Sequence, residues 1–279
     1  MAGVRGTKDY RPKDRKRDGI REDEDNGFNN ESPDILEGRN PVLEALKSGR
    51  SINKILVAKG SREGSINQII SIAREKGIVI QEVERAKLDS ISETHGHQGV
   101  IAFAAVRNYV DVDDILNAAR EKGEAPFIII LDGIKDAYNL GSILRTSDAA
   151  GAHGVIIPKR RAIGLTPAVP KASAGAVEYV PVARVTNIAQ TIEYLKSRNV
   201  WVVGVDMSGK DSFYGSDLTG PVALVIGSEG EGISRLAAAR CDFLVHIPMK
   251  GQISSLNAAV AGAIVMYEVL KQREKAAYR

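Results

Sequence analysis

The sequence predicts an α/β fold in which a small α/β domain precedes a larger domain built on a parallel sheet. From residue 126 onward, continuous apolar runs rich in β-branched residues alternate with segments of helical periodicity. Such runs are typical of parallel strands that helices cover on both faces. The chain has 279 residues, more than the usual single-domain length of about 100 to 200 residues. Two folded domains are therefore expected.

The composition excludes several classes of protein. With 43% hydrophobic and 26% charged residues, the chain matches an average globular protein, and no apolar stretch approaches the roughly 20 residues that span a bilayer. We therefore expect no membrane attachment. The basic first residues are followed by no apolar stretch, so they predict no secretory signal peptide. The single cysteine, Cys241, cannot form an internal disulfide or a cysteine-based zinc cage, which fits the reducing cytoplasm.

Residues 1–33 are expected to form a disordered charged tail. They hold 8 Lys or Arg and 8 Asp or Glu but almost no aliphatic side chains, so they cannot bury enough apolar surface to offset the entropy lost on folding. The charges are segregated, because residues 1–18 hold seven basic and three acidic residues. A solvated tail is the favoured interpretation, and a basic arm that touches nucleic acid is the alternative. The formal net charge of the chain, +3, permits a nucleic-acid partner without requiring one.

Residues 34–106 alternate short helical and strand patterns, which predicts a compact α/β domain. The helical patterns are NPVLEALKSG and SINQIISIAREKG, and the strand patterns are KILVA, IVIQEV and GVIAFAAV. His95 and His97 stand in a glycine-rich loop, but no convincing third ligand accompanies them, so no metal site is expected. Residues 107–125 are polar, contain one short helical pattern, DVDDILNAAREKG, and are expected to be a linker.

Residues 126–279 are expected to form the parallel-sheet domain. Its strands are predicted by the apolar runs FIIILD, GVIIP, WVVGVD, VALVIGS and FLVHIP. Its helices are predicted by LGSILRTSDAAG, VTNIAQTIEYLKSRN and SSLNAAVAGAIVMYEVLKQREK. Because ligands bind beyond the carboxyl ends of parallel strands, functional residues are expected in the loops after these runs.

Three of these loops combine glycines with a few polar or charged residues ahead of a helix. They read GIKDAYNLGSILRT after the first run, GSEGEGIS after the fourth and PMKGQISSLNAA after the fifth. Glycine lets the backbone approach a ligand closely, and a helix start offers free N–H groups. One such loop is weak evidence, whereas three at corresponding strand ends indicate a ligand site.

The first loop offers Asn139 and Arg145 as candidate site residues. Asn139 can donate and accept hydrogen bonds at a helix start, and Arg145 presents a planar charged fork that suits a phosphate. The alternative is that Asn139 only caps the helix and that Arg145 forms a surface ion pair.

The other two loops add an acid and a group of small polar residues. Glu229 lies in a glycine-flanked turn that needs no acid for its shape, whereas Glu231 suits the N-terminal charge of the following helix. Ser254, Ser255 and Asn257 open the last helix. One of these three must be the helix cap, so the pattern alone does not give all three a functional role.

Competing motifs are incomplete. Residues 204–210, GVDMSGK, match the start of a phosphate loop, but Asp211 stands where magnesium needs Ser or Thr, and its charge would repel ATP phosphates. The sequence has no G-x-S-x-G, H-E-x-x-H, C-x-x-C or forward G-x-G-x-x-G motif. Hydrolases, metalloenzymes and dinucleotide-dependent dehydrogenases therefore lose their usual support.

Taken together, the three loops resemble, in order and spacing, the three motifs of the SpoU (TrmH) family of RNA ribose 2′-O-methyltransferases. The matching segments are NLGSILRTSDAAGAHGVIIP, ALVIGSEGEGIS and IPMKGQISSLNAAVAGAIVMYE, and the likeness covers residues 126–279. Residues 37–106 look like the substrate-binding domain, related to ribosomal protein L30e, that precedes the catalytic domain in bacterial 23S rRNA guanosine 2′-O-methyltransferases. The charged tail has no counterpart in this resemblance.

The resemblance implies a SPOUT-type domain whose C-terminal segment forms a deep trefoil knot and wraps S-adenosylmethionine, in an obligate homodimer. General rules of chain topology argue against knots, so spacing alone would not predict one. By the same likeness, the cofactor would be held, largely through backbone groups, by Gly227, Ile247 and Leu256. The polar site positions would be Asn139, Arg145, Glu229, Ser255 and Asn257.

The chemistry that the resemblance implies needs no metal. A ribose hydroxyl must lose its proton before it attacks a methyl sulfonium, so orientation and a proton acceptor are sufficient. In this family the arginine of the first motif is often proposed as the base. A guanidinium stays protonated up to about pH 12, so Arg145 is better suited to clamp a phosphate and to stabilise a developing alkoxide. Glu229 is the other candidate, as proton acceptor or as a partner that orients Arg145 and Asn139, and the sequence leaves this choice open.

The leading prediction is S-adenosylmethionine-dependent 2′-O-methylation of a guanosine in 23S rRNA, with the rRNA or a large-subunit precursor as partner. A tRNA ribose methyltransferase is the first alternative, and a non-catalytic RNA-binding or ribosome-assembly factor is the second. Phosphate contacts are expected from the basic residues Lys159, Arg160, Arg161 and Lys171, with a solvated loop as the alternative. An apolar face of the last helix, formed by Val260, Ile264 and Tyr267, is compatible with dimerisation and equally with core packing.

Overall fold

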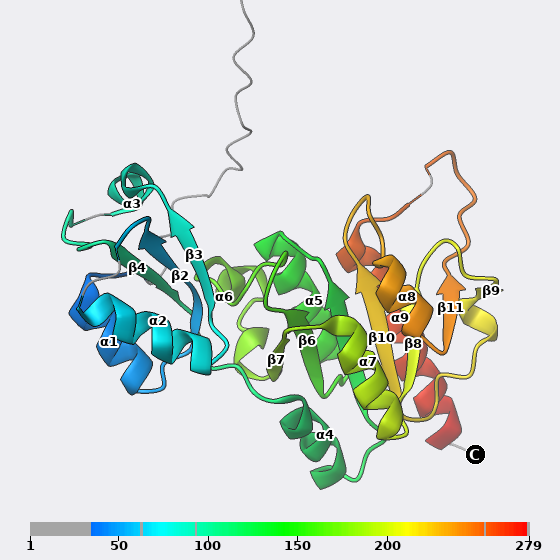
Figure 1. Ribbon diagram of the computed structural model, residues 1–279. Helices are drawn as coiled ribbons and strands as arrows, with labels where there is room; N and C mark the ends of the chain where they lie inside the picture. The colour runs from blue at the N-terminus through cyan, green and yellow to red at the C-terminus, as the bar shows by residue number, and fades with distance from the viewer. Residues whose placement is uncertain (1–34, 62–63, 93, 254, 278–279) are drawn as a thin grey trace, which may run out of the picture. The chain divides into compact units, whose positions relative to one another are not determined.

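The computed structural model describes residues 35–61, 64–92, 94–253 and 255–277, which form two sheets and their helices (Figure 1). A four-stranded sheet, here called the small sheet, is followed along the chain by a seven-stranded sheet, the large sheet. The α/β prediction is confirmed. The predictions for residues 1–33 and for Ser254 fall outside the described residues.

The small sheet has the strand order β1-β4-β2-β3. Its strands are β1 (Ile35–Glu37), β2 (Ile52–Ala58), β3 (Val79–Val83) and β4 (Val100–Ala104), and its helices are α1 (Arg39–Lys47), α2 (Ser65–Glu75) and α3 (Arg85–Ile91). Strands β2 and β3 are parallel, whereas β4 pairs antiparallel with β1 and β2. Alternate β2 residues face opposite sides, so Ile55 packs with α1 and α2 while Leu56 packs with Leu88 of α3. Both faces thereby acquire a small apolar core.

The segment expected to be a linker is partly built into the core of the large sheet. Its predicted helix forms as α4 (Val112–Glu121). Ile115 of α4 is fully buried in one cluster with Ile128 and Ile156 of the large sheet. A Cβ atom at Gly154 would lie 2.6 Å from the Ile115 side chain, so the glycine makes room for the helix. Helix α4 therefore packs on the large sheet and is not a free connection.

The large sheet has the strand order β7-β6-β5-β10-β8-β11-β9, and all its neighbouring strands are parallel. Its strands are β5 (Phe127–Asp132), β6 (Gly154–Pro158), β7 (Val182–Val185), β8 (Trp201–Val205), β9 (Asp211–Ser212), β10 (Val222–Gly227) and β11 (Phe243–His246). Its helices are α5 (Ala137–Ala149), α6 (Ala168–Ala172), α7 (Ile188–Ser197), α8 (Arg235–Arg240) and α9 (Ala258–Ala277), with short 3-10 turns at Ala176–Glu178 and Phe213–Gly215. The five predicted apolar runs all form strands.

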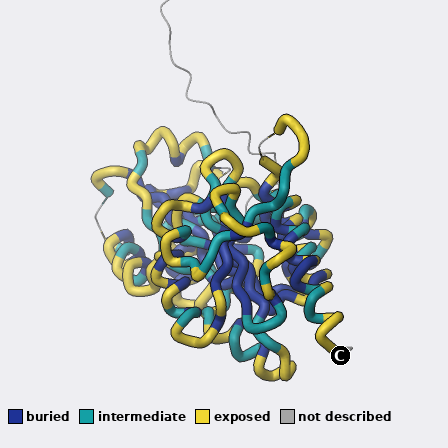
Figure 2. Tube along the Cα trace, turned by 90° about the vertical axis from the view of Figure 1, so that its right-hand side faces the viewer, coloured by how far each residue is buried: buried dark blue, intermediate teal, exposed yellow. Residues whose placement is uncertain are grey.

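Both faces of the large sheet are buried, which explains its continuous apolar runs. In β5, Ile129 and Leu131 join a core that includes residues of α5 and α9, whereas Ile128 and Ile130 join a core that includes residues of α4, α7 and α8. Figure 2 shows the result as dark-blue strands inside a shell of exposed loops. The sequence did not predict β7, β9 or α6. Strand β9 has two residues and α6 five, too short for a periodic pattern to reveal.

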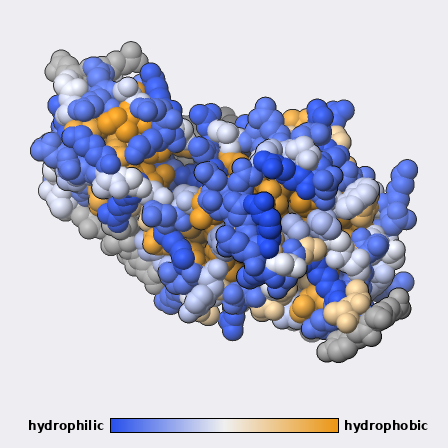
Figure 3. All heavy atoms as spheres, turned by 90° about the horizontal axis from the view of Figure 1, so that it is seen from below, coloured by the Kyte–Doolittle hydropathy of each residue, from blue (hydrophilic) through white to orange (hydrophobic). Residues whose placement is uncertain are grey.

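No helix in the described ranges combines the length and the apolar character that crossing a bilayer requires. The face drawn in Figure 3 is mostly hydrophilic, with hydrophobic areas that are small and separate.

Candidate functional site

Three loops that are far apart in the sequence meet beyond the carboxyl ends of β5, β10 and β11. Strands β5 and β10 are adjacent, and the loops that follow them place Asn139 and Glu229 side by side. The Asn139 Nδ2 donates a hydrogen bond of 3.2 Å to Glu229 Oε1. Asn257, at the start of α9, donates through Nδ2 to Asn139 Oδ1 at 3.0 Å and also to Glu229 Oε1. We call Asn139, Glu229 and Asn257 the site triad.

The position of Asn139 shows that it is not a helix cap. The N-cap of α5 is Asp136, whose carboxylate accepts a 2.8 Å hydrogen bond from the backbone N–H of Asn139. Because Asp136 satisfies this helix end, the Asn139 side chain is available to bond with Glu229 and Asn257. The capping alternative for Asn139 is therefore wrong.

Asn257 serves two purposes at once. Its Oδ1 accepts hydrogen bonds from the backbone N–H groups of Ala259, at 3.0 Å, and Val260, at 3.2 Å, so Asn257 is the cap of α9. With Oδ1 committed to the helix, the amide can only turn its Nδ2 donors toward Asn139 and Glu229. Ser255 is exposed and makes no hydrogen bond within the described residues. The structure thus places Asn257 in the triad and leaves Ser255 outside it.

Glu229 stands at the tip of a tight loop that glycines shape. Ser228 and Gly232 exchange two backbone hydrogen bonds of 3.1 and 3.0 Å and close the loop. A Cβ atom at Gly227 would lie 2.0 Å from the backbone carbon of Gly232, so only glycine fits there. Glu231 lies ahead of Ser234, the N-cap of α8, and so outside the first turn of that helix.

Arg145 is not brought into the triad. It lies on α5 two turns beyond Asn139, is exposed, and makes no hydrogen bond or ion pair with any described residue. The surface ion pair that the sequence left open for Arg145 is not found among the described residues. A guanidinium that has no partner among the described residues is free to meet an anion from outside.

The three positions assigned to the cofactor lie on the segments that end β10, follow β11 and lead into α9. Gly227 ends β10, Ile247 follows β11 and Leu256 directly precedes Asn257. In the strand order, β10 and β11 lie two spacings apart, or about 10 Å. Ile247 packs against the core, whereas Ile253 and Leu256 are exposed by 72% and 36%. A glycine without room for a side chain and exposed apolar groups nearby fit a ligand held by backbone contacts and apolar packing.

Two aspartates near the site were not among the predicted residues. Asp132 ends β5, and its Oδ2 accepts a 2.8 Å hydrogen bond from the backbone N–H of Ser234, which ties the loop after β10 to its neighbour. Asp206 follows β8, and a Cβ atom on Gly232 would approach its Oδ2 to 3.1 Å. The sequence could have indicated both aspartates, because the runs FIIILD and WVVGVD each end in an acid at the ligand-facing end of a strand.

The basic residues after β6 lie close to the loops of the site. Arg160 and Arg161 are exposed, and within the described ranges neither forms an ion pair. The backbone oxygen of Arg161 would come within 3.9 Å of a Cβ on Gly133, in the loop of Asn139. Lys159 has a different neighbour, because its ammonium group lies near Gly77 in the turn before β3. Lys171 is exposed at the end of α6.

The structure shows the surroundings of His97 and Cys241, whose residue types often bind metals. His97 is buried, contacts Asp89 at 2.8 Å through Nε2, and accepts a 3.1 Å hydrogen bond from Gly99 through Nδ1, so it stabilises its own loop. Burial raises the pKa of Cys241 to about 12, which keeps it a neutral thiol. Within the described residues, no group of three His, Cys, Asp or Glu side chains could hold a metal ion.

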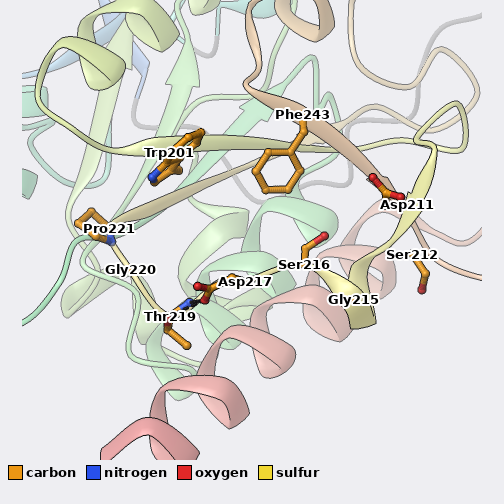
Figure 4. Close-up of a pocket in the computed structure, with 10 residues that line it drawn as sticks. All are labelled: Trp201, Asp211, Ser212, Gly215, Ser216, Asp217, Thr219, Gly220, Pro221 and Phe243. Carbon is orange, nitrogen blue, oxygen red and sulfur yellow. Dashed lines mark hydrogen bonds between the residues drawn. The ribbon is translucent and has the colours of Figure 1, made fainter.

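A second hollow lies away from the triad, next to the amino ends of β8, β10 and β11 (Figure 4). It is an open groove of about 660 Å³. The aromatic rings of Trp201 and Phe243 face it from the first residues of their strands. Its other lining residues are Asp211, Ser212, Gly215, Ser216, Asp217, Thr219, Gly220 and Pro221. None of the predicted site residues lines this groove, so it is separate from the site triad.

Comparison with known families matches both parts of the chain. Residues 126–267 match the model of the SpoU rRNA Methylase family. Residues 35–110 match the model of the RNA 2′-O ribose methyltransferase substrate binding domain.

Relatives and solved structures agree with these matches. The chain is 52% identical over 240 residues, 86% of its length and 96% of the relative, to YacO of Bacillus subtilis (strain 168), which is named a TrmH family tRNA/rRNA methyltransferase. A Staphylococcus aureus (strain MRSA252) protein with the same family designation is 46% identical over 239 residues, again 86% of this chain and 96% of the relative. The SpoU methyltransferase AviRb from Streptomyces viridochromogenes, in complex with AdoMet, is 26% identical with a TM-score of 0.55 over 86% of this chain and 90% of its own. An AdoMet-bound rRNA methyltransferase from Sinorhizobium meliloti is 26% identical with a TM-score of 0.53 over 85% and 86% of the two chains.

Proposed function

Because the chain belongs to the SpoU rRNA methylase family, we propose that it methylates a ribose 2′-hydroxyl of RNA, with a guanosine of 23S rRNA as the substrate. The observation that carries the proposal is the site triad, in which three separate loops deliver Asn139, Glu229 and Asn257 to one point. The family match at residues 35–110 supports an RNA as the molecule acted on.

The cofactor is S-adenosylmethionine, which the family uses and which AviRb binds in its solved complex. When bound, it supplies a methyl group made electrophilic by the neighbouring sulfonium. Gly227, Ile247 and Leu256 are the residues that would hold it, through backbone groups and apolar contact. The fit rests on Gly227, where the backbone of Gly232 leaves no room for a side chain, and on the exposed Leu256.

Within this proposal the triad positions the ribose. Both amides donate to the same oxygen of Glu229, Oε1, and no described residue bonds to Oε2. The free Oε2 can accept the hydrogen bond or the proton of a substrate hydroxyl, while the amides prevent the carboxylate from turning away. Arg145 stays charged and acts as the clamp for a neighbouring phosphate. Substrate orientation and a fixed proton acceptor are what this arrangement contributes to the rate.

The domain boundaries follow from the same proposal. Residues 34–106, related to L30e, would capture RNA, and residues 126–279 would carry the cofactor and the reaction. The likeness also implies that the C-terminal segment forms a trefoil knot. The hydrogen bond from Asn257 to Glu229 shows that the segment after β11 lies against the loop after β10, an adjacency compatible with the implied knot.

A methyl-transfer assay tests the proposal. Labelled S-adenosylmethionine is supplied with 23S rRNA that lacks its ribose methylations, with tRNA in parallel, and the product is mapped by reverse-transcription stops at low nucleotide concentration. One stop at a guanosine of the rRNA supports the proposal, whereas transfer to tRNA alone assigns the enzyme to the other substrate. Transfer to neither RNA, with cofactor binding intact, favours the non-catalytic alternative. Arg145→Ala and Asn139→Ala must abolish transfer while Tyr194→Phe, on α7, retains it.

We also propose a homodimer that uses α9. Val260 and Tyr267 lie seven residues apart on this helix and are 48% and 50% exposed, so core packing does not explain them. Ile264, between them, packs against the core. Sedimentation of Tyr267→Glu should show a monomer, whereas Ala276→Glu, an exposed change of equal charge on the same helix, should leave a dimer. A wild-type chain that sediments as a monomer would contradict the proposal.

A further inference from the structure

A polar network, buried at Asn53 and partly buried at Tyr109 and Arg184, connects the small sheet to the loop that carries Arg160 and Arg161. It begins at Asn53, the extra residue of a β-bulge in β2, where Ile52 pairs with Ala104 and Lys54 with Phe103. Asn53 is only 7% exposed. A bulge turns one side chain out of the regular ladder, and a buried amide at such a place needs partners.

The partners of Asn53 come from outside the small sheet. Tyr109, on the segment after β4, donates from its hydroxyl to Asn53 Oδ1 at 2.5 Å, and the same hydroxyl accepts from the backbone N–H of Leu165 at 2.8 Å. Asn53 Nδ2 donates to the carbonyl oxygens of Ala104 and Leu165, each at 3.2 Å. Every hydrogen-bonding group of the Asn53 amide and the Tyr109 hydroxyl is thus directed at a fixed partner.

Arg184, on β7, provides a second connection. Its Nη1 donates to the carbonyl of Ile52 and its Nη2 to that of Lys159, each at 3.2 Å. The guanidinium also stacks over the Tyr109 ring at 5.2 Å. Burial lowers the pKa of Arg184, and burial raises the pKa of Tyr109. These groups are withdrawn from water, so their geometry is held more firmly than that of surface contacts.

The loop that the network holds, residues 159–165, runs alongside the site. The backbone N–H of Ile163 donates to the carbonyl of Ile134 at 2.8 Å, in the loop that leads to Asn139. Gly164 lies against the network, where a Cβ atom would come within 2.4 Å of Asn53 Oδ1 and 2.8 Å of Tyr109 Oη. Arg160 and Arg161 are therefore fixed from one side by the small sheet and from the other by the site loop.

We propose that Asn53, Tyr109 and Arg184 are positioning residues that hold loop 159–165 in a fixed position relative to the small sheet. An RNA bound to the small sheet then meets Arg160 and Arg161 with its backbone at a set distance from the triad. Apolar contact alone would join the two parts, but directional bonds between partly buried groups select one arrangement. The inference rests on the proposed function for its substrate, while the network itself does not depend on that function.

The test is a double-mutant cycle between the network and the loop. Tyr109→Phe keeps the ring and removes the hydroxyl, and it should lower kcat/KM for rRNA by about tenfold, since two partly buried hydrogen bonds are lost. The affinity for S-adenosylmethionine should not change. In a background that already carries Arg160→Ala and Arg161→Ala, the same substitution should change kcat/KM by less than about twofold. If Tyr109→Phe lowers kcat/KM by the same factor in both backgrounds, the proposal is overturned. The network would then not act through the arginines.

A second measurement does not need activity. Hydrogen exchange at the Leu165 amide should be faster in Tyr109→Phe, and also in Asn53→Ala, than in the wild type. Matched controls are Tyr194→Phe and Asn117→Ala, whose side-chain bonds lie on the exposed surface. Unchanged Leu165 exchange refutes the network even in an active enzyme. Faster exchange in a chain that methylates no RNA would instead refute the proposed function and leave the network standing.

Discussion

The Asn257 side chain donates a 3.0 Å hydrogen bond to the Asn139 side chain, although 118 residues separate the two. Asn257 also caps α9, so the start of the last helix and the geometry of the site depend on one amide. The same pair meets Glu229. Stability and activity can therefore be separated by substitutions at this position.

The variants Asn257→Asp and Asn257→Ala should differ from each other in stability, but both should lose methyl-transfer activity. Aspartate retains an oxygen that accepts from Ala259 and Val260, so the cap is preserved, whereas alanine loses it at a cost of about 1 kcal/mol. Both variants lose the donor to Asn139, and aspartate adds a second carboxylate beside Glu229. Methyl transfer should fall at least about a hundredfold in both. Thermal unfolding together with the assay checks this, and an active Asn257→Asp would remove Asn257 from the site.

Gly227→Ala should abolish cofactor binding. The added methyl group would stand 2.0 Å from the backbone of Gly232, so the loop that carries Glu229 must move. Gly215→Ala is the control, because no atom lies within 4 Å of the new group and the residue has no positive φ. Isothermal titration with S-adenosylmethionine gives the result, and wild-type affinity in Gly227→Ala would show that the loop is not part of the cofactor site.

His153 should make the protein less stable as the pH falls below about 6.5. Burial lowers its pKa, with Glu124 opposing, so the unfolded chain takes up a proton before the folded protein does. The stabilisation is complete above the ordinary pKa of 6.5 and is lost as the pH falls toward the lowered folded value.

His153→Asn tests this pH dependence. Asparagine retains an acceptor for the Phe127 N–H, which His153 Nδ1 now binds at 3.0 Å. Urea unfolding at about pH 7 and about pH 5.5 should show a smaller loss of stability in this variant than in the wild type. The exposed His95→Asn serves as control. Equal losses in the wild type and in His153→Asn would assign the pH dependence to other groups.

The double variant Arg160→Ala with Arg161→Ala should bind RNA more weakly. Its binding should also depend less on the salt concentration. Removal of two phosphate contacts should lower the slope of log K against log salt by roughly 1.5. Arg120→Ala with Lys122→Ala removes the same charge from the end of α4 and should leave the slope unchanged. Filter binding at several salt concentrations is sufficient. An unaltered slope in the first variant would support the solvated-loop alternative.

The sequence by itself determined the fold class, and it predicted the strands of the large sheet and the glycine-rich loops that follow them. These features have local signatures, because strands buried on both faces need continuous apolar runs and close backbone approach needs glycine. The likeness of three motifs then indicated the family and its cofactor, which the comparisons confirmed. The roles of all the predicted site residues remain predictions, and Arg145 and Ser255 make no hydrogen bond to the triad.

Only the tertiary structure decided which polar residues meet. Sequence patterns did not distinguish the cap of α9 from the site residue, and the structure shows that Asn257 is both. They indicated a linker where α4 packs Ile115 into the core, and they gave no sign that Asn53 meets Tyr109 and Leu165. The physical reason is that propensity and periodicity describe a residue and its near neighbours along the chain. A hydrogen bond between loops depends on where distant strands end, and only the folded sheet brings those ends together.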